Sequence, residues 1–189
     1  MNTELIFSNI AKHISLDKEE QRHFASLLEE RLLNKNEYIL RQGERCQQLY
    51  FVNSGILRAF YLNEQGKDAT VMFAMKDWWI TDMHCFLNEL PAMVNIQVVE
   101  SASVLGLSKE KLDKLYLEIP KFNTFFRILM QNAYCREQLR MMQRLSLQAK
   151  DRYEGFLAKY PHLASQVTLK QIASYLGVTP EFLSYIRKK

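Results

Sequence analysis

The chain has 189 residues, a formal net charge of +4 and 48% hydrophobic residues. This length suits one large or two small domains, and the apolar content excludes an intrinsically disordered chain. No run of about 18 apolar residues occurs, and residues 1–20 lack a long apolar segment, which argues against a membrane span or a signal peptide. We therefore expect a globular, cytoplasmic protein with no membrane partner.

Helical and then β-type patterns divide the first 108 residues. Apolar residues recur at helical spacing in two groups and predict helices over residues 1–33: Leu5, Ile6, Ile10 and Ile14, then Phe24, Leu27, Leu28 and Leu32. From about residue 37 to 108, short runs rich in β-branched and aromatic residues are separated by Gly43, Gly55 and a turn at residues 63–66. Many short strands in this space predict a compact β-barrel or roll.

A long helix is predicted after Pro120, because at least 26 residues follow without Gly or Pro, or about 39 Å of helix. A helix of this length cannot be covered by so small a barrel. We therefore expect part of its apolar face to pack against its copy in a second subunit; the alternative is that the face packs only within its own chain. The residues that we assign to this dimer seam are Phe126, Leu129, Met130, Ala133 and Leu139.

Two short helices with their own start signals form the last 23 residues. Thr168 and Gln171 have the spacing of a capping box, and Gly177 is suited to end the first helix. Thr179 can cap the second helix, with Pro180 at its first position. A helix pair with so short a connection predicts a helix-turn-helix, whose second helix would enter the DNA major groove; an ordinary helical hairpin is the alternative.

The charge distribution supports nucleic-acid binding. Residues 1–120 hold 13 Lys/Arg and 17 Asp/Glu, whereas residues 121–189 hold 12 and 4. The cations are therefore concentrated where the helix-turn-helix is predicted, as phosphate neutralisation requires. A solvated helical surface could carry a similar excess.

The order of these segments resembles the Crp/Fnr family of bacterial transcription regulators. The stretches that carry the resemblance are ILRQGERCQQLYFVNSGILRAFYLNEQGKD, IQVVESASVLGLSKEKLDKL and LKQIASYLGVTPEFLSYIRKK. The first two look like strands of a cyclic-nucleotide-binding β-roll, and the third looks like the family's helix-turn-helix. Each motif alone is weak, but their order and spacing are fairly specific.

The resemblance implies an α+β fold: N-terminal helices with a double-stranded β-roll (residues 1–118), a long dimerisation helix (119–150) and a helix-turn-helix (151–189). Familiar members continue into a β-hairpin wing, and since this sequence ends at Lys189 we expect no obvious wing. The implied function is a homodimeric regulator on two-fold-symmetric, double-stranded DNA, with RNA polymerase as a further partner.

The phosphate-binding segment departs from the family pattern. Asp82 stands at the ribose-binding Glu, Thr81 replaces a glycine, and Ala92 and Met93 stand where the phosphate-binding Arg and Ser belong. A buried phosphate without a charged partner is costly, which argues against cyclic AMP. We expect no cofactor and either an unknown small-molecule effector or none. The candidate pocket residues are Thr81, Asp82, Met83, Ala92, Met93, Glu137 and Gln138.

Metal and redox versions of the family sensor fit poorly. Cys46, Cys85 and Cys135 are the only cysteines, so residues 1–45 cannot hold an N-terminal iron–sulfur cluster, and we expect three buried free thiols. The adjacent His84 and Cys85 could suggest haem ligation, but packing explains such a pair better.

The recognition helix also departs from its relatives. Pro180 and Tyr185 occupy the positions of the family's arginines, and only Glu181 is retained. We expect Glu181, Ser184 and Tyr185 to contact bases, and the neighbouring cations to bind phosphates. The predicted DNA-binding residues are Lys170, Gln171, Thr179, Pro180, Glu181, Ser184, Tyr185, Arg187, Lys188 and Lys189.

Two other classes of function remain. The C-terminal helices could dock a protein instead of DNA, and a DNA footprint would separate these readings. A cupin-like metal oxygenase would need clustered ligands, whereas the four histidines are scattered, so we expect no enzyme. For the regulator, the hypothesis is that binding near residues 82–94 shifts the long helices and so changes the spacing of the recognition helices.

Overall fold

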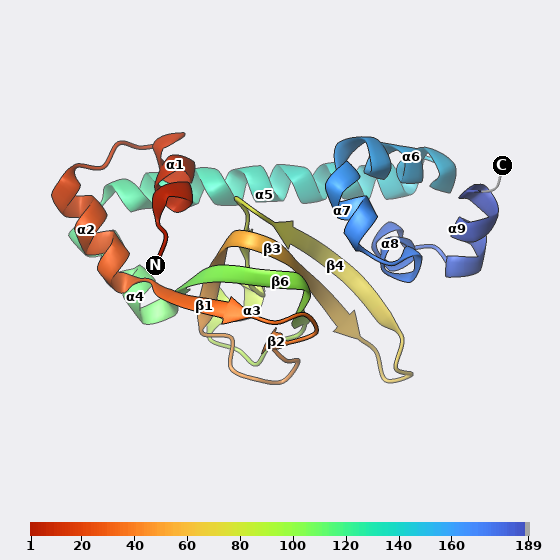
Figure 1. Cartoon of the computed structure of the whole chain (residues 1–189), viewed down its shortest axis with the longest axis horizontal. Helices are drawn as coiled ribbons and strands as arrows, with labels where there is room; N and C mark the ends of the chain where they lie inside the picture. Colours follow the sequence, from red (N-terminus) through yellow and green to blue (C-terminus); the bar gives the residue numbers. More distant parts are fainter. Residues whose placement is uncertain (188–189) are drawn as a thin grey trace.

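A computed structural model describes residues 1–187, which form a curled antiparallel sheet with helices at both ends and one long helix running along it (Figure 1). The helices are α1 (Glu4–Ala11), α2 (Lys18–Leu27), α3 (Met83–Asn88), α4 (Lys109–Glu118), α5 (Lys121–Ser146), α6 (Ala149–Lys159), α7 (Pro161–Gln166), α8 (Leu169–Leu176) and α9 (Pro180–Arg187). The strands are β1 (Glu29–Leu33), β2 (Tyr38–Leu40), β3 (Gln48–Leu62), β4 (Asp68–Met75), β5 (Trp79–Ile80) and β6 (Asn95–Ser108).

Two long, bent strands organise the sheet, whose order is β1-β6-β3-β4, with β2 on β6 and β5 on β3. The pairing of β3 with β6 shifts register three times, which bends both strands into a roll. Gly55 lies at one of these shifts with φ +82°, and a Cβ there would stand 2.4 Å from the Ser101 carbonyl oxygen. The prediction of many short strands is thus wrong in detail: Gly55 bends a 15-residue strand instead of ending it.

The helical prediction for residues 1–33 is wrong mainly at residues 29–33, which form strand β1. Helix α2 begins with a capping box between Asp17 and Glu20 and ends at Leu27. The chain then becomes β1 and pairs with β6, where Glu29 faces Gly106. The helical spacing of Leu32 had suggested a longer helix, but Leu32 is 77% exposed, so that spacing does not reflect a buried helical face. Pairing with a neighbouring strand decides the conformation.

The first turns of α5 lie in the core of the roll. Phe122, Phe125 and Phe126 are each at most 4% exposed, and they form an aromatic cluster with Trp79 and Phe24. The 26-residue length of α5 agrees with the prediction. However, Phe126 lies inside its own chain, so its assignment to a surface seam needs correction.

Helices α6 to α9 gather beyond the far end of the roll (Figure 1). Their core includes Phe156, Leu163, Ala173 and Leu183, each at most 4% exposed. Side chains of the roll join the same cluster: Ile56, Phe73 and Val99. The predicted α+β architecture is therefore confirmed, with the C-terminal helices packed directly against the sheet. None of the helices within residues 1–187 combines the length and the apolar character needed to cross a membrane.

Candidate functional site

A cavity of about 410 Å³ lies between the roll and α5. Of the seven predicted effector-pocket residues, four line it: Thr81, Asp82, Met83 and Glu137. A volume of this size is within the range of small-molecule sites. This hollow, here named the roll cavity, is the candidate effector site.

Asp82 organises one wall of the roll cavity. Its carboxylate Oδ2 accepts hydrogen bonds from the backbone N–H groups of Met93 (2.8 Å) and Val94 (3.2 Å), and its Oδ1 accepts from the Cys85 N–H (3.3 Å). The side chain is 9% exposed and caps α3. These hydrogen bonds join the start of α3 to residues 93 and 94, so Asp82 orders this wall of the cavity.

Ala92, Met93 and Gln138 do not contribute side chains to the lining of the roll cavity. Ala92 is 4% exposed, and its N–H donates to the Glu44 carbonyl (2.7 Å), which ties this segment to the neighbouring loop. Met93 is 55% exposed, and its contribution is the backbone N–H held by Asp82. Gln138 lies exposed on α5. The prediction of these three side chains as pocket walls is therefore wrong.

The sequence analysis missed several walls of the roll cavity. Leu129, Met130 and Ala133 line it from α5, although they were assigned to the dimer seam. Trp78 and Trp79 line it from the segment that enters β5. The apolar stripe of α5 was a valid signal for burial, but it could not tell whether the roll or a second subunit covers each turn.

The thiols and histidines of this region form no joint site. Cys46 and Cys85 are buried as expected, and burial raises the pKa of the Cys46 thiol. Cys135 is exposed on α5, contrary to the prediction. His84 is exposed whereas Cys85 is fully buried, so the pair shares no pocket. Among residues 1–187, no three His, Cys, Asp or Glu side chains gather as metal ligands would.

The predicted helix-turn-helix has the local geometry that its start and stop signals indicate. Gln171 Oε1 accepts from the Thr168 N–H (2.9 Å) while Thr168 Oγ1 accepts from the Gln171 N–H (3.2 Å), which completes the capping box. Gly177 ends α8 in the left-handed conformation, with φ +72°. Thr179 Oγ1 accepts from the Phe182 N–H (3.2 Å) at the start of α9.

Most of the predicted DNA contacts lie at the surface. Lys170, Thr179, Glu181 and Arg187 are exposed and Tyr185 is 54% exposed, while Gln171, Pro180 and Ser184 are half-buried. Lys188 and Lys189 lie outside the described residues. Phe182 is a surface residue that the sequence analysis missed: it is 48% exposed on α9 and could contact a thymine methyl group.

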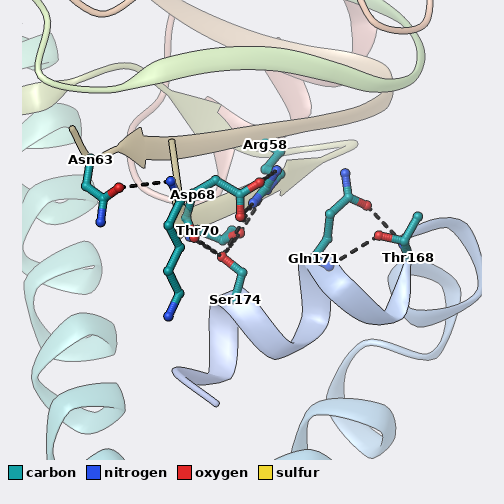
Figure 2. A network of polar contacts seen from close by, with 8 residues as sticks. Arg58, Asn63, Asp68, Thr70, Thr168, Gln171 and Ser174 are labelled. Atoms are coloured by element: carbon teal, nitrogen blue, oxygen red, sulfur yellow. Dashed lines mark hydrogen bonds and ion pairs between the residues drawn. The ribbon is translucent and has the colours of Figure 1, made fainter. Parts of the chain in front are cut away.

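A polar network joins α8 to the roll (Figure 2). The guanidinium of Arg58 on β3 forms a two-point ion pair with Asp68 on β4 (2.9 and 3.3 Å) and donates to Thr70 Oγ1 (2.8 Å). Ser174 of α8 points into this group: its hydroxyl oxygen accepts from the Thr70 N–H (2.8 Å) and donates to the Asp68 carbonyl (3.1 Å). We call these four residues the α8 latch.

Arg58 is 3% exposed, so the α8 latch contains a buried cation. Burial by itself would raise the pKa of Asp68. The hydrogen bond and charge of Arg58 outweigh that effect and, together with Ser174 and Lys170, hold the pKa of Asp68 below its ordinary value. Lys170 is thus close enough to influence the latch while its side chain remains exposed.

A second cavity of about 400 Å³ lies between α5, α6 and α8. Arg152 of α6 holds these elements together. Its guanidinium donates to the carbonyl of Arg144 (3.3 Å) in α5 and to that of Leu147 (2.9 Å) just after α5. It also donates to the carbonyl of Leu176 (3.4 Å) at the end of α8. The cations of this region therefore also join helices, in addition to any contact with DNA.

Comparison with known proteins agrees with this fold and this arrangement. Residues 30–118 match the family profile described as "Cyclic nucleotide-binding domain". An "Anaerobic regulatory protein" of Bacillus subtilis is 30% identical over 89 residues, which cover 47% of this chain and 37% of that protein. The "Transcriptional activator protein Anr" of Pseudomonas protegens is 28% identical over 170 residues, which cover 82% of this chain and 68% of that protein. The chain thus spans less than two thirds of the first of these relatives.

A solved crp/fnr-family regulator from Eubacterium rectale superposes with a TM-score of 0.74 at 17% identity, covering 92% of this chain and 82% of that one. This likeness concerns the fold and includes the C-terminal helices. Together with the named relatives and the matched domain, it agrees with the resemblance seen in the sequence. The chain is thus similar in sequence to regulators named as anaerobic regulatory or transcriptional activator proteins, and similar in fold to a crp/fnr-family structure.

Proposed function

We propose that this protein is a homodimeric transcription regulator that binds two-fold-symmetric, double-stranded DNA through α8 and α9 and responds to a small molecule in the roll cavity. The observation that carries the proposal is the capped helix pair whose second helix carries Glu181, Tyr185 and Arg187 at its surface. Such a helix can enter a major groove, and Lys170 on α8 can reach a phosphate.

The roll cavity is connected to the DNA-binding helices by direct contacts. Glu137 lines the cavity and pairs with Arg140 (2.6 Å), whose guanidinium donates to the Val71 carbonyl (2.5 Å) and lies 5.1 Å from the ring centre of Tyr175 on α8. On the other wall, the ring of Trp78 lies 6.0 Å from that of Tyr160. These contacts support a relay in which occupation of the cavity changes how α8 is held.

The proposed units are residues 1–118 for sensing, 119–150 for dimerisation and 151–189 for DNA binding. Exposed apolar side chains on the second half of α5 support the dimer: Tyr134, Leu139, Met141, Met142 and Leu145. The seam would therefore lie farther along α5 than the sequence indicated, since Leu129, Met130 and Ala133 line the roll cavity. RNA polymerase is the partner that a DNA-bound regulator of this family would address.

Selection of the purified protein on random duplex DNA tests the proposal, followed by affinity measurements against salt for the wild type and Glu181→Ala. We expect the wild type to select a two-fold-symmetric motif. In Glu181→Ala, the free-energy preference for one base pair of that motif should fall by ~1–3 kcal/mol. Lys170→Ala is the matched control. It should weaken binding to all DNA sequences alike and lower the slope of log affinity against log salt concentration by about one. Weak, sequence-independent binding would contradict the proposal and favour a protein-docking role for these helices.

A further inference from the structure

The charges that line the roll cavity differ from those that a nucleotide phosphate requires. Three carboxylates and one guanidinium line it, so the lining carries a formal charge of −2; the six polar residues are Asp77, Thr81, Asp82, Asn132, Arg136 and Glu137. The other twelve lining residues are apolar. An anion entering this cavity would lose its hydration, and the described part of the lining offers it one guanidinium against three carboxylates.

Hydrogen-bonding groups along these walls are already satisfied within the chain. Asp77 accepts from Asn9 Nδ2 (2.8 Å) and from Lys12 Nζ (2.5 Å). The Thr81 hydroxyl donates to the Gln48 carbonyl (2.8 Å). The remaining carboxylates are held by the contacts of Asp82 with backbone N–H groups and of Glu137 with Arg140. A ligand therefore meets few polar atoms that still need a partner.

Arg136 is the one cation that residues 1–187 contribute to the lining, and it is already engaged. Its guanidinium lies 5.0 Å from the ring centre of Trp78, and its Nε lies 3.6 Å from Glu137. By contrast, Asn132 makes no side-chain hydrogen bond among the residues that the structure describes, and it lies one turn before Arg136 at an exposed position of α5. One uncharged polar group of a ligand could pair with this amide.

We propose that the roll cavity binds an uncharged aromatic molecule, and that Asp82 fills the place that a ligand's anionic group would otherwise take. The inference rests on the proposed function, in which this cavity is the effector site. Asp82 already holds the Met93 and Val94 N–H groups, so the wall is ordered without a ligand phosphate. Trp78 and Trp79 offer aromatic surface, and stacking and apolar burial supply the affinity.

A matched pair of dyes tests the charge preference on the full-length protein. N-phenyl-1-naphthylamine is uncharged, and 8-anilinonaphthalene-1-sulfonate has the same aromatic body with one anionic group. The chain has two tryptophans, and both line the roll cavity, so energy transfer from tryptophan reports binding there. We expect the neutral dye to bind about tenfold or more tightly than the sulfonate. Cyclic AMP should not displace it.

Substitutions assign the binding to this cavity. Ala133→Phe places a ring in the cavity from α5. The affinity for the neutral dye should fall by about tenfold or more, because the ring occupies volume that the dye needs. Ala158→Phe makes the same change at an exposed position of α6 and should leave the affinity unaltered. Circular dichroism verifies that both variants are folded.

Three results would overturn the inference: equal or tighter binding of the sulfonate, displacement of the neutral dye by cyclic AMP, or neutral-dye binding that is unaffected by Ala133→Phe. Absence of saturable neutral-dye binding would overturn it as well. Because the DNA selection is performed without any dye, a two-fold operator found alongside any of these results would leave the proposed regulator intact and reject only the ligand class.

Discussion

Arg58 is the residue on which the attachment of α8 depends most directly. A buried guanidinium is tolerated because Asp68 provides the opposite charge and Thr70 accepts a further hydrogen bond. Its plane also lies 4.5 Å from the ring centre of Phe60. Removal of the Asp68 charge would leave the Arg58 cation buried and unpaired, so this site should be sensitive to pH and to substitution.

Asp68→Asn tests the charge of the α8 latch. Since the pKa of Asp68 is lower in the folded chain than its ordinary value of 3.8, its carboxylate stabilises the fold above that pH, and this contribution is lost as the pH falls through the folded-state pKa. Urea unfolding at roughly pH 6 and pH 3 should show the variant less stable at the higher pH and the difference smaller at the lower one.

The control for this measurement is Glu64→Gln, which neutralises an exposed carboxylate in the turn before β4. Its stability should follow that of the wild type at both pH values. If the difference in free energy of unfolding between Asp68→Asn and the wild type were the same at both pH values, the charge of Asp68 would not stabilise the fold.

At the scale of residues, the sequence predicts local backbone chemistry better than it predicts the site. The capping box of Thr168 and Gln171 could be identified because both partners are three positions apart. The role of Asp82 could not, because its partners at residues 93 and 94 come close only when α3 and the start of β6 are folded. The assignment of Ala92 and Met93 to the pocket failed because a position in a sequence pattern does not show which way its side chain points.

Among the elements, α8 is held to the roll through side chains near its C-terminal end. One surface carries Ser174 and Tyr175, which contact the roll through the latch and through a ring pair with Phe73 at 5.5 Å. Lys170 lies one turn before Ser174 and remains exposed. The position of α8, and with it that of α9, therefore depends on strand β4 of the roll.

Ser174→Ala removes the hydroxyl that joins α8 to β4. The buried N–H of Thr70 loses its acceptor, so we expect a loss of ~1–3 kcal/mol in the free energy of unfolding. Hydrogen exchange at the α8 amides should accelerate while exchange in β6 changes little. Mass spectrometry of peptides from both elements measures this.

Ser165→Ala is the matched control, because that hydroxyl is exposed and donates only to the His162 carbonyl. Its effect should be within about 0.5 kcal/mol. If α8 exchanged at the same rate in Ser174→Ala and in the wild type, the apolar contacts would suffice to hold the helix, and the latch would not control its attachment.

Element boundaries could be predicted where one signal acts alone. Pro120 and the uninterrupted run after it predict α5, and Gly177 predicts the end of α8. Residues 29–33 show the opposite case, because a helical spacing and a strand partner compete, and the partner lies some 70 positions away in β6. Long-range pairing of this kind is not visible in a local pattern.

For the whole molecule, the second half of α5 presents several exposed apolar side chains. Met141 is 57% exposed and Leu145 is 83% exposed, and these residues lie four positions apart on one side of the helix. A continuous apolar surface of this kind is typical of an interface between subunits. The sequence predicted such a seam, but it could not tell which turns the roll covers.

A double substitution, Met141→Glu with Leu145→Glu, tests the proposed dimer. Charges on both sides of a two-fold seam would repel, so sedimentation should show a monomer and affinity for a two-fold operator should fall. Leu32→Glu changes a leucine that is 77% exposed on β1, outside α5, and should leave the dimer intact. A dimer that persists in the double variant would move the seam away from these residues.

The carboxylate of Asp82 has a consequence for how the protein would respond to ionic strength. Binding to DNA releases counterions and weakens steeply as salt is added. An uncharged molecule that enters a cavity whose carboxylates are already paired releases no counterions, and salts such as sulfate favour its transfer out of water. The two binding events would therefore change in opposite directions with salt, so one salt titration could separate DNA binding from occupation of the roll cavity.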